Sequence, residues 1–543
     1  MRRLIPLSLF LLPLVSICGH AAQTPGVLHV AQDGDIYTLD PALSYDTSSI
    51  SFTRLMYRGL VEYDFEGKIH PEVAQSYMVS RDGRTYRFQL RPNVRWWDGT
   101  PVEAEDFRYA IERTLNPATV SDGTAFFTDI MGATAWVKAK TMETLPIGHI
   151  KGIQVPSTRT IVFRLNQPDA TFLPRLTLPF AYAIPRRYVE KLRQHYGGGR
   201  ALYEAFSEHP MGNGPFKFVE WVHNSSLRLE KNPDYFRHGL PRANALEVQL
   251  GINAARQTTL FEQGSLDILP ITDTVPAEFL RLKNSPKWKG LIADAPMMDI
   301  RYMAMNTEAP PFKDRRVRQA ICYAINRDRI ISFLTGRATK ARGALPKGVP
   351  SYDPKLFSYP YDPAKAKRLL KAARFKSTSA LPLLYPNSEF WYAQAAQSIK
   401  QDLAVIGIKV DTKGMRYSEV KAIAGRRDPY SSRLVILGWI QDFPDPSSYL
   451  DPLFNGRSIT ATSSLNRSFY SNPRVNRLLD EAMKISNFPA RWTKYREAQR
   501  IIVNDSPVVF LHNTYRYFIH QPRVQGFRLH PAWTEAYEYL SAN

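Results

Sequence analysis

Alternating apolar and polar residues predict two antiparallel strands in the first third of the chain. Between Thr85 and Arg91, aromatic and aliphatic side chains alternate strictly with polar ones, and residues 161–165 repeat the pattern. A period of two residues places the apolar side chains on one face of a strand and the polar ones on the other, wet face. We therefore expect both strands to lie in one sheet-rich region that ends before about residue 180.

The second half of the chain shows a helical period instead. Apolar side chains recur at intervals of three and four residues from Val317 to Ile325, which predicts a helix with one apolar face and with Asp314 as its N-cap. Asp362 and Pro363 predict the start of another helix, because Asp is a preferred cap and Pro a preferred first residue.

A third apolar pattern runs through residues 399–403 to Gly407 and precedes a short apolar run, 408–410, that is typical of a strand. Helices that alternate with strands indicate an α/β unit in this half. The chain has 543 residues, which is too long for one ordinary domain and favours two or three.

Composition and charge narrow the function classes. Apolar residues make up 44% and charged residues 22%, which excludes a disordered or collagen-like chain. The net charge is +21, but the cations are spread along the chain without a Lys/Arg block. This favours a generally basic surface over nucleic-acid binding, although an anionic partner stays open.

The N-terminus has the three-part pattern of a secretory signal peptide. Two arginines are followed by an uncharged apolar stretch from Leu4 to Cys18 and by small residues that end at Ala21 or Ala22. The apolar stretch is short for a membrane span. We expect export and cleavage after residue 21 or 22.

Two cysteines bear on anchoring and on disulfide bonds. The residue before Cys18 is Ile17, where a lipoprotein signal has a small residue, so we expect a free periplasmic protein and not a lipoprotein. If Cys18 leaves with the signal peptide, Cys322 is the single cysteine of the mature chain and no intrachain disulfide forms.

Catalytic and cofactor motifs are missing. The sequence has no H-E-x-x-H, no phosphate-binding loop and no G-x-S-x-G, and the run 197–199 lacks the spacing of a phosphate cradle. The acidic pairs Glu105/Asp106 and Asp442/Asp445 are more typical of solvated or structural carboxylates than of acid–base catalysis. We predict no enzyme, no cofactor and no metal site.

Several segments, in one order along almost the whole mature chain, resemble the extracytoplasmic solute-binding proteins of peptide ABC importers, the oligopeptide/dipeptide-binding proteins of family 5. Each segment alone is weak, whereas the ordered set is specific. The segments are 74–77, 82–91, 96–102 and 105–107, then 212–216 and 230–236, then Asn306 with 311–320, and finally 438–446.

The resemblance implies an α/β, two-lobed periplasmic-binding-protein-like fold with a two-strand hinge and an extra sheet-rich subdomain on lobe I. The sequence departs from the family at Arg374, where a glycine usually ends the helix, so that helix cap is in doubt. The implied domains are 1–21 for the signal peptide, 22–57, 181–271 and 507–543 for lobe I, 58–180 for the extra subdomain, and 272–506 for lobe II.

The resemblance also implies ligand-binding residues. Asp442 takes the position of the aspartate that receives a peptide's α-ammonium, an interaction that a closed, low-dielectric cleft strengthens. An alternative is that Asp442 caps a turn beside the neighbouring prolines, while Asp445 is expected to be structural. Gly438, Trp439 and Ile440 resemble a strand that bonds the backbone of an extended peptide, although a core role for Trp439 stays open.

The opposite wall and the carboxylate site are less defined. Tyr45, Asp46 and Thr47 resemble the stretch that lobe I contributes to the cleft. Arg427 lies where one oligopeptide-binding relative has a cation near the peptide's C-terminus, while a second such cation is replaced by Ile436. In a chain this basic, Arg427 is more typical of an ordinary surface arginine than of a ligand-binding one, so peptide length and side-chain preference stay open.

The expected function is therefore an exported, monomeric binding protein that captures short peptides and delivers them to an inner-membrane ABC permease with its ATPase subunits. The nearest alternative keeps the fold and changes the cargo to a nickel complex, haem, an opine or an oligosaccharide. An oligosaccharide is disfavoured because it leaves Asp442 without a cation. An exported peptidase and a polyanion or nucleic-acid binder are further alternatives, each without a supporting motif.

Overall fold

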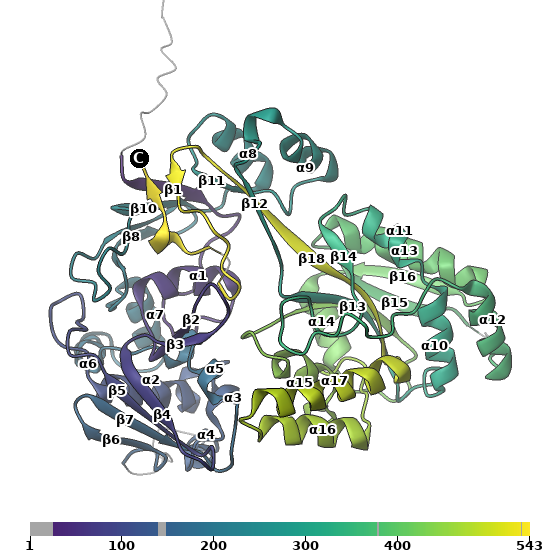
Figure 1. The fold of residues 1–543 in the computed structure, drawn as a ribbon, viewed down its shortest axis with the longest axis horizontal. Coiled ribbons are helices and arrows are strands. Elements are labelled where there is room, and N and C mark those ends of the chain that lie inside the picture. The colour runs from purple at the N-terminus through teal and green to yellow at the C-terminus, as the bar shows by residue number, and fades with distance from the viewer. Residues whose placement is uncertain (1–24, 140–147, 377–378, 534) are drawn as a thin grey trace, which may run out of the picture.

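The computed structural model shows an α/β protein with two lobes (Figure 1). One long strand, β18 (Val508–His520), runs from one lobe to the other. In the part of the chain that the structure describes, no helix is long and apolar enough to cross a membrane. The expected signal peptide lies outside the described residues. Those residues are 25–139, 148–376, 379–533 and 535–543.

Lobe I is built on a four-stranded sheet with the strand order β1-β10-β9-β8. β1 and β10 run parallel and the other neighbours antiparallel, and helices α1, α6 and α7 share one hydrophobic core with this sheet. The elements of this part are β1 (Val27–Ala31), α1 (Thr47–Met56), α6 (Arg186–Tyr196), α7 (Arg200–Glu208), β8 (Phe216–Val222), β9 (Ser226–Lys231), β10 (Ala245–Gln249), α8 (Ala254–Glu262), β11 (Ile268–Pro270), α9 (Pro276–Lys283), β19 (Val524–Gln525) and β20 (Ser541–Ala542). α9 falls within the residues 272–506 expected for lobe II, but it shares a hydrophobic core with α8 and β11, so we propose that this boundary lies beyond α9.

A second, antiparallel sheet with the order β4-β5-β7-β6 forms the sheet-rich region of lobe I. All its elements fall within the residues 58–180 expected for an extra subdomain, whose boundaries stay a prediction. They are β2 (Val61–Tyr63), β3 (Ile69–Pro71), β4 (Ala74–Val79), β5 (Thr85–Leu90), α2 (Ala104–Leu115), α3 (Thr124–Phe127), α4 (Ala133–Val137), β6 (Ile153–Ser157), β7 (Thr160–Arg164) and α5 (Phe172–Arg175).

Both strands predicted from alternation exist and pair with each other, as β5 and β7. In β5 the aromatic and aliphatic side chains are buried, as expected. The expected wet face of β7 is wrong, because Thr160 and Val162 are buried with Ile161 and Phe163. Val162 pairs in register with Arg87 of β5 and Gln154 of β6, and these longer side chains flank it on the polar face. The hydroxyl of Thr160 bonds Gln89 and Ser157 on the two neighbouring strands.

Lobe II packs helices around a mixed sheet that contains the path β18-β13-β17-β15-β16. Its two core clusters lie on the two faces of this sheet, because alternate residues of β13 and β17 belong to different clusters. Its elements are β13 (Asp299–Met305), α10 (Arg315–Ala324), α11 (Arg327–Ser332), β14 (Ala338–Lys340), α12 (Pro363–Ala372), β15 (Leu381–Pro386), α13 (Phe390–Val405), β16 (Val410–Met415), α14 (Tyr417–Gly425), β17 (Leu434–Ile440), α15 (Ser447–Phe454), α16 (Pro473–Met483) and α17 (Phe488–Asp505).

The helices predicted in this half are confirmed with their caps. Asp314 caps α10 by accepting the backbone N–H of Arg316, and Asp362 caps α12 by accepting that of Lys365. Past the end of α12, Arg374 has φ = 53°, the left-handed conformation that glycine adopts at this place without strain.

The third predicted helix is α13, but the short strand after it begins later than expected. β16 starts at Val410 and continues to Met415, so residues 408 and 409 precede it. Gly407 has φ = 83°, and the N–H groups of Gly407 and Ile408 bond back to the last turn of α13. Ile408, which the apolar run predicted to lie in the strand, therefore belongs to the C-terminal turn of the helix.

Two antiparallel strands, β12 (Ile292–Pro296) and β18, connect the lobes. Residues 508–514 of β18 pair with β13 and β14 of lobe II, whereas residues 515–520 pair with β12 and β11. We therefore propose that the last lobe boundary, expected at residue 507, lies inside β18.

Candidate ligand-binding cleft

A cavity of about 370 Å³ lies between the two lobes. Lobe I lines it with the start of α1, the segment around Phe180 and the C-terminal segment 529–533, which we call the C-terminal wall. Lobe II lines it with the end of β17, and the β12–β13 connection and β18 complete it. Both lobes therefore contact a ligand in this cavity at once.

Asp442 lies in this cavity, two residues beyond the end of β17. Its backbone N–H donates to Ser448 Oγ (2.8 Å), and its carboxylate accepts the hydroxyl of Tyr45 from lobe I (2.8 Å). Burial raises the pKa of Asp442 to about 6, although the hydrogen bonds from Tyr45 and Ser448 lower it. Within the described residues no basic side chain forms an ion pair with this carboxylate.

Asp445, not Asp442, holds the turn that follows. Its carboxylate accepts the backbone N–H (2.9 Å) and hydroxyl (2.6 Å) of Ser447 and both terminal nitrogens of Arg491. Asp445 and Arg491 are buried, so this pair fixes the start of α15. Asp445 is structural, as predicted, and the turn leaves the Asp442 side chain directed into the cavity.

Gly438, Trp439 and Ile440 all line the cavity at the end of β17. Residues 434–440 pair with β13 along one edge, whereas β15 pairs with the other edge only at Leu434 and Val435. Among the described strands, none covers that second edge from residue 436 onward. Its backbone groups are therefore available to an extended ligand.

Trp439 combines the two roles that the sequence left open. Its indole N–H donates to the carbonyl of Ser448 (2.7 Å), and its ring packs against the core of lobe II while also lining the cavity. Ile440 is 45% exposed and presents an apolar side chain to the same space.

The three residues of lobe I that were predicted to contact the ligand, 45–47, do not all line the cavity. Tyr45 and Thr47 line the cavity, and the ring of Tyr45 packs against Phe180 with a centroid distance of 5.7 Å. Asp46 instead caps α1 by accepting the backbone N–H of Ser49 (2.9 Å) and is not among the lining residues.

The structure does not bring Arg427 to the cavity. Its half-exposed guanidinium pairs with Glu308 (2.6 Å), and it is absent from the lining. The arginines that line the cavity are Arg301 and Arg516, which sequence reasoning missed. An arginine within the apolar run of β13 is the signal that could have identified Arg301.

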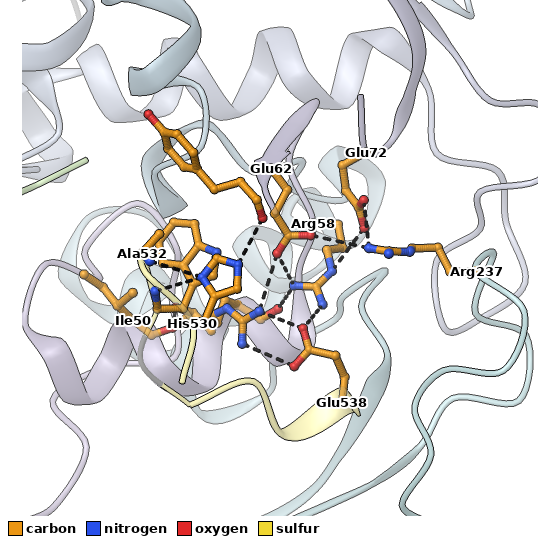
Figure 2. A network of polar contacts seen from close by, with 12 residues as sticks. Ile50, Arg58, Glu62, Glu72, Arg237, His530, Ala532 and Glu538 are labelled. Atoms are coloured by element: carbon orange, nitrogen blue, oxygen red, sulfur yellow. Dashed lines mark hydrogen bonds and ion pairs between the residues drawn. The ribbon is translucent and has the colours of Figure 1, made fainter. Parts of the chain in front are cut away.

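A buried ionic network anchors the C-terminal wall to lobe I (Figure 2). Glu538 accepts bonds from Arg54 (2.7 Å) and Arg58 (2.8 Å) at the end of α1, and these two cations lower the pKa of Glu538 to about 2. Arg58 and Arg237 also face Glu72, and Arg54 and Arg58 pair with Glu62 of β2. The network ties α1, β2 and the C-terminal residues into one rigid side of the cavity.

His530 shapes the C-terminal wall as a neutral ring. Its Nδ1 accepts the backbone N–H groups of Ala532 (3.1 Å) and Trp533 (3.3 Å), and its Nε2 donates to the carbonyl of Tyr63 (3.2 Å). Burial and the nearby Arg54 guanidinium lower the pKa of His530 to about 4. The imidazole therefore adds no charge to the cavity at neutral pH.

The lobes touch on both sides of the cavity. Gln441 donates to the carbonyl of Pro531 (3.5 Å), and the backbone N–H of Ala170 donates to the carbonyl of Met483 (2.8 Å). Phe443 of lobe II is 5% exposed and packs into the core of the sheet-rich region of lobe I. The structure is therefore a closed form of the two lobes.

Comparisons with known proteins agree with this architecture. Residues 68–461 match the family model described as bacterial extracellular solute-binding proteins, family 5. The chain is 28% identical over 507 residues to the glutathione-binding protein GsiB of Pectobacterium atrosepticum, with 92% of this chain and 91% of the relative covered. It is also 28% identical over 544 residues to a probable di/tripeptide-binding protein of Pseudomonas aeruginosa, with 97% of each covered.

Solved structures resemble the described fold over almost its whole length. The periplasmic binding protein DppA of Helicobacter pylori, in complex with the peptide STSA, superposes with a TM-score of 0.76 at 26% identity. The match covers 95% of this chain and 98% of that one.

Proposed function

Because the chain belongs to family 5 of the bacterial extracellular solute-binding proteins, which bind solutes and are not enzymes, we propose that it captures short peptides in the interlobe cavity. It then delivers them, as a monomer in the periplasm, to an inner-membrane ABC permease and its ATPase subunits. Export by the N-terminal signal peptide is part of this proposal. The relatives named for di- and tripeptides and for glutathione, and the neighbour bound to STSA, support a peptide cargo.

The observation that carries the proposal is the Asp442 carboxylate. No cationic side chain among the described residues pairs with it in the cavity, and burial raises its pKa. A ligand ammonium supplies the missing positive charge and gains a charge-assisted hydrogen bond. A neutral ligand such as an oligosaccharide leaves this charge uncompensated.

Two further features suit a peptide. The uncovered edge of β17 offers backbone groups that pair with any sequence, which fits a protein that handles many peptides. Thr47 and Tyr45 from lobe I face the same space, so the ligand contacts both lobes and stabilises the closed form.

Thermal unfolding with a library of di- to pentapeptides tests the proposal. Peptides that occupy the native state raise the melting temperature in proportion to the logarithm of their concentration above Kd. N-acetylated copies of the same peptides, and the Asp442→Asn variant, serve as matched controls and give smaller shifts. No shift with any peptide, together with a shift by haem, a nickel–histidine complex, an opine or an oligosaccharide, overturns the peptide assignment.

A further inference from the structure

Helix α12 presents a strongly basic surface to solvent at the end of lobe II that lies away from lobe I (Figure 1). Its apolar face is covered, because Ala366 and Leu370 are buried in a core that they share with α10. Residues 365–376 contain no acidic residue. Five cations on the opposite face and just beyond the helix are exposed, and we call them the basic patch: Lys367, Arg368, Lys371, Arg374 and Lys376.

The basic patch carries its charge without compensation. Within the described part of the chain, none of its five side chains forms an ion pair. Three carboxylates of the segments around α12 have other partners. Asp314 pairs with Arg316 (2.6 Å), and Asp353 pairs with Arg500 (3.4 Å). Asp362 accepts the N–H of residue 365 (2.8 Å) as the cap of α12. The patch is therefore a local excess of positive charge on the surface of lobe II.

Arg374 adds its charge to the patch at a cost in backbone strain. It follows the C-cap of α12, and its φ of 53° lies in the left-handed region that glycine adopts without strain. Its N–H donates to the carbonyl of Lys371 (3.0 Å), a bond that a glycine makes equally well. The exposed guanidinium is thus not needed to end the helix, and what it contributes at this place is a positive charge.

Exposed aromatic rings lie beside the basic patch. Phe357 is 53% exposed and Tyr361 is 45% exposed, in the segment that leads into α12. The ring of Phe357 packs on that of Tyr359 with a centroid distance of 5.0 Å, and both residues line a groove of about 350 Å³ together with Lys365 and Leu369 of α12. Exposed rings next to Lys and Arg side chains are typical of surfaces that lie at the boundary of a lipid bilayer.

We propose that the basic patch, with Phe357 and Tyr361 beside it, docks lobe II on a bilayer of anionic phospholipid. Each Lys or Arg near such a surface adds to the attraction, and five unpaired cations complement a layer of phosphate groups. The rings enter the headgroup region, where their apolar surface leaves water. A nucleic acid or an acidic protein offers the same charge to the patch but no apolar layer for rings that stand this far into solvent.

Docking through α12 leaves the ligand site open. No residue from 353 to 376 lines the interlobe cavity. Lobe I therefore stays free to move about β12 and β18 while lobe II remains on the bilayer (Figure 1). A protein that is held at the surface has a higher effective concentration near any membrane-bound partner. The inference goes beyond the proposed function and does not depend on the identity of the cargo.

Flotation of the mature protein with lipid vesicles tests the proposal, and the signal peptide is left out because it binds lipid by itself. The vesicles are phosphatidylcholine alone, or phosphatidylcholine with about 30% phosphatidylglycerol. We expect the protein to float with the anionic vesicles only, and to be released as NaCl rises from about 0.05 to 0.5 M. Equal binding to both kinds of vesicle, or none to the anionic kind, overturns the proposal.

A matched pair of double variants separates the patch from the overall positive charge. Lys367→Gln with Lys371→Gln removes two charges of the patch and lowers the partition coefficient about 10- to 30-fold, since each cation is worth about fivefold. Arg187→Gln with Lys191→Gln removes two exposed charges at the same spacing on α6 of lobe I and leaves binding unchanged. An equal loss in both proteins shows that only the net charge matters and contradicts docking through α12.

Two single variants test the strained arginine and the ring. Arg374→Gly lowers the partition coefficient about fivefold, while the melting temperature stays the same or rises because the strain is gone. Phe357→Ser weakens binding by a similar factor at low and high salt, because the contribution of the ring is apolar. Unchanged binding in both variants contradicts the docking surface.

The alternative partner and the proposed function are read separately. If anionic vesicles fail to bind while heparin does, and the variant at 367 and 371 loses heparin, the patch takes a polyanion and the bilayer is wrong. Thermal shifts by peptides are the same in these variants as in the wild type. A failure of bilayer docking therefore leaves the peptide function standing, and the reverse holds as well.

Discussion

The pH dependence of peptide affinity follows from the position of Asp442. Burial raises its pKa from 3.8 to about 6, so half of the ligand-free protein carries a neutral acid at that pH. A peptide α-amino group has a pKa near 8 and stays protonated below pH 7. If the complex requires the carboxylate, affinity falls by about a factor of ten between pH 7 and pH 5, because only about one protein molecule in eleven is then ionised.

The assay is calorimetric titration with tri-alanine at half-unit steps from pH 5 to pH 7.5, in the wild-type protein and in Asp442→Asn. The variant loses a charge-assisted bond, which costs about 1.5–3 kcal/mol or roughly 10- to 150-fold in affinity at pH 7. Its affinity no longer changes with pH in this window. N-acetyl tri-alanine brings no ammonium, so it binds the wild-type protein no better than the variant at pH 7 and its affinity does not rise from pH 5 to pH 7.

The same substitution has an opposite effect on stability without ligand. A raised folded pKa means that the ligand-free protein loses stability as pH rises from about 4 to 6, by at most about 3 kcal/mol, since solvent in the cavity screens the charge. Asp442→Asn removes this loss and melts at a higher temperature at pH 7. A flat wild-type pH profile, or the same step in the variant, refutes the reasoning.

Three further substitutions test the contacts that hold the cavity and its two lobes in position. Arg491→Met leaves Asp445 buried and unpaired and lowers the free energy of unfolding by about 3–5 kcal/mol in denaturant titration; a loss below 1 kcal/mol contradicts the structural role. Phe443→Ala removes the side chain that lobe II inserts into lobe I, so small-angle scattering shows a more open ligand-free protein and peptide affinity drops; an unchanged radius of gyration refutes this closure contact. Gly438→Ala places a Cβ at 2.8 Å from Arg301 Nη1, so it displaces a guanidinium that lines the cavity and weakens the binding of tri-alanine; an unchanged affinity argues against this close approach.

Local patterns predicted the local structure well. Asp314 and Asp362 each accept a backbone N–H from the first turn of the helix they cap. Such a cap depends only on residues that are close in sequence, so the sequence predicts it. The alternation of apolar and polar residues in β5 likewise predicts which of its side chains are buried, because it depends only on the strand itself. The start of β16 was placed too early because the helix C-terminal turn competes for the same apolar residues.

The ligand site could be predicted only where one segment carries it. The end of β17 and Asp442 belong to one continuous motif, so the resemblance placed them in a cleft that the structure also shows. Arg301 could not be placed in the cavity from the sequence, because its position there depends on the pairing of β13 with β17. That pairing brings Arg301 opposite Gly438, a residue 137 positions away in the chain. Arg427 lies near the cavity in sequence pattern only, since Glu308 holds it at the surface.

The C-terminal wall illustrates the same limit. Nothing local in the sequence marks Glu538 as a buried partner of Arg54 in α1 and of Arg58 just after it, 484 and 480 positions earlier. Only the folded chain brings these charges together and shows that they fix the position of residues 529–533 beside the ligand.

A crystal structure of the protein with tri-alanine tests the central claim most directly. The account predicts the peptide ammonium within hydrogen-bond distance of the Asp442 carboxylate and the peptide backbone on the uncovered edge of β17. A peptide bound in the opposite direction, or one that leaves Asp442 bonded to Tyr45 alone, contradicts it.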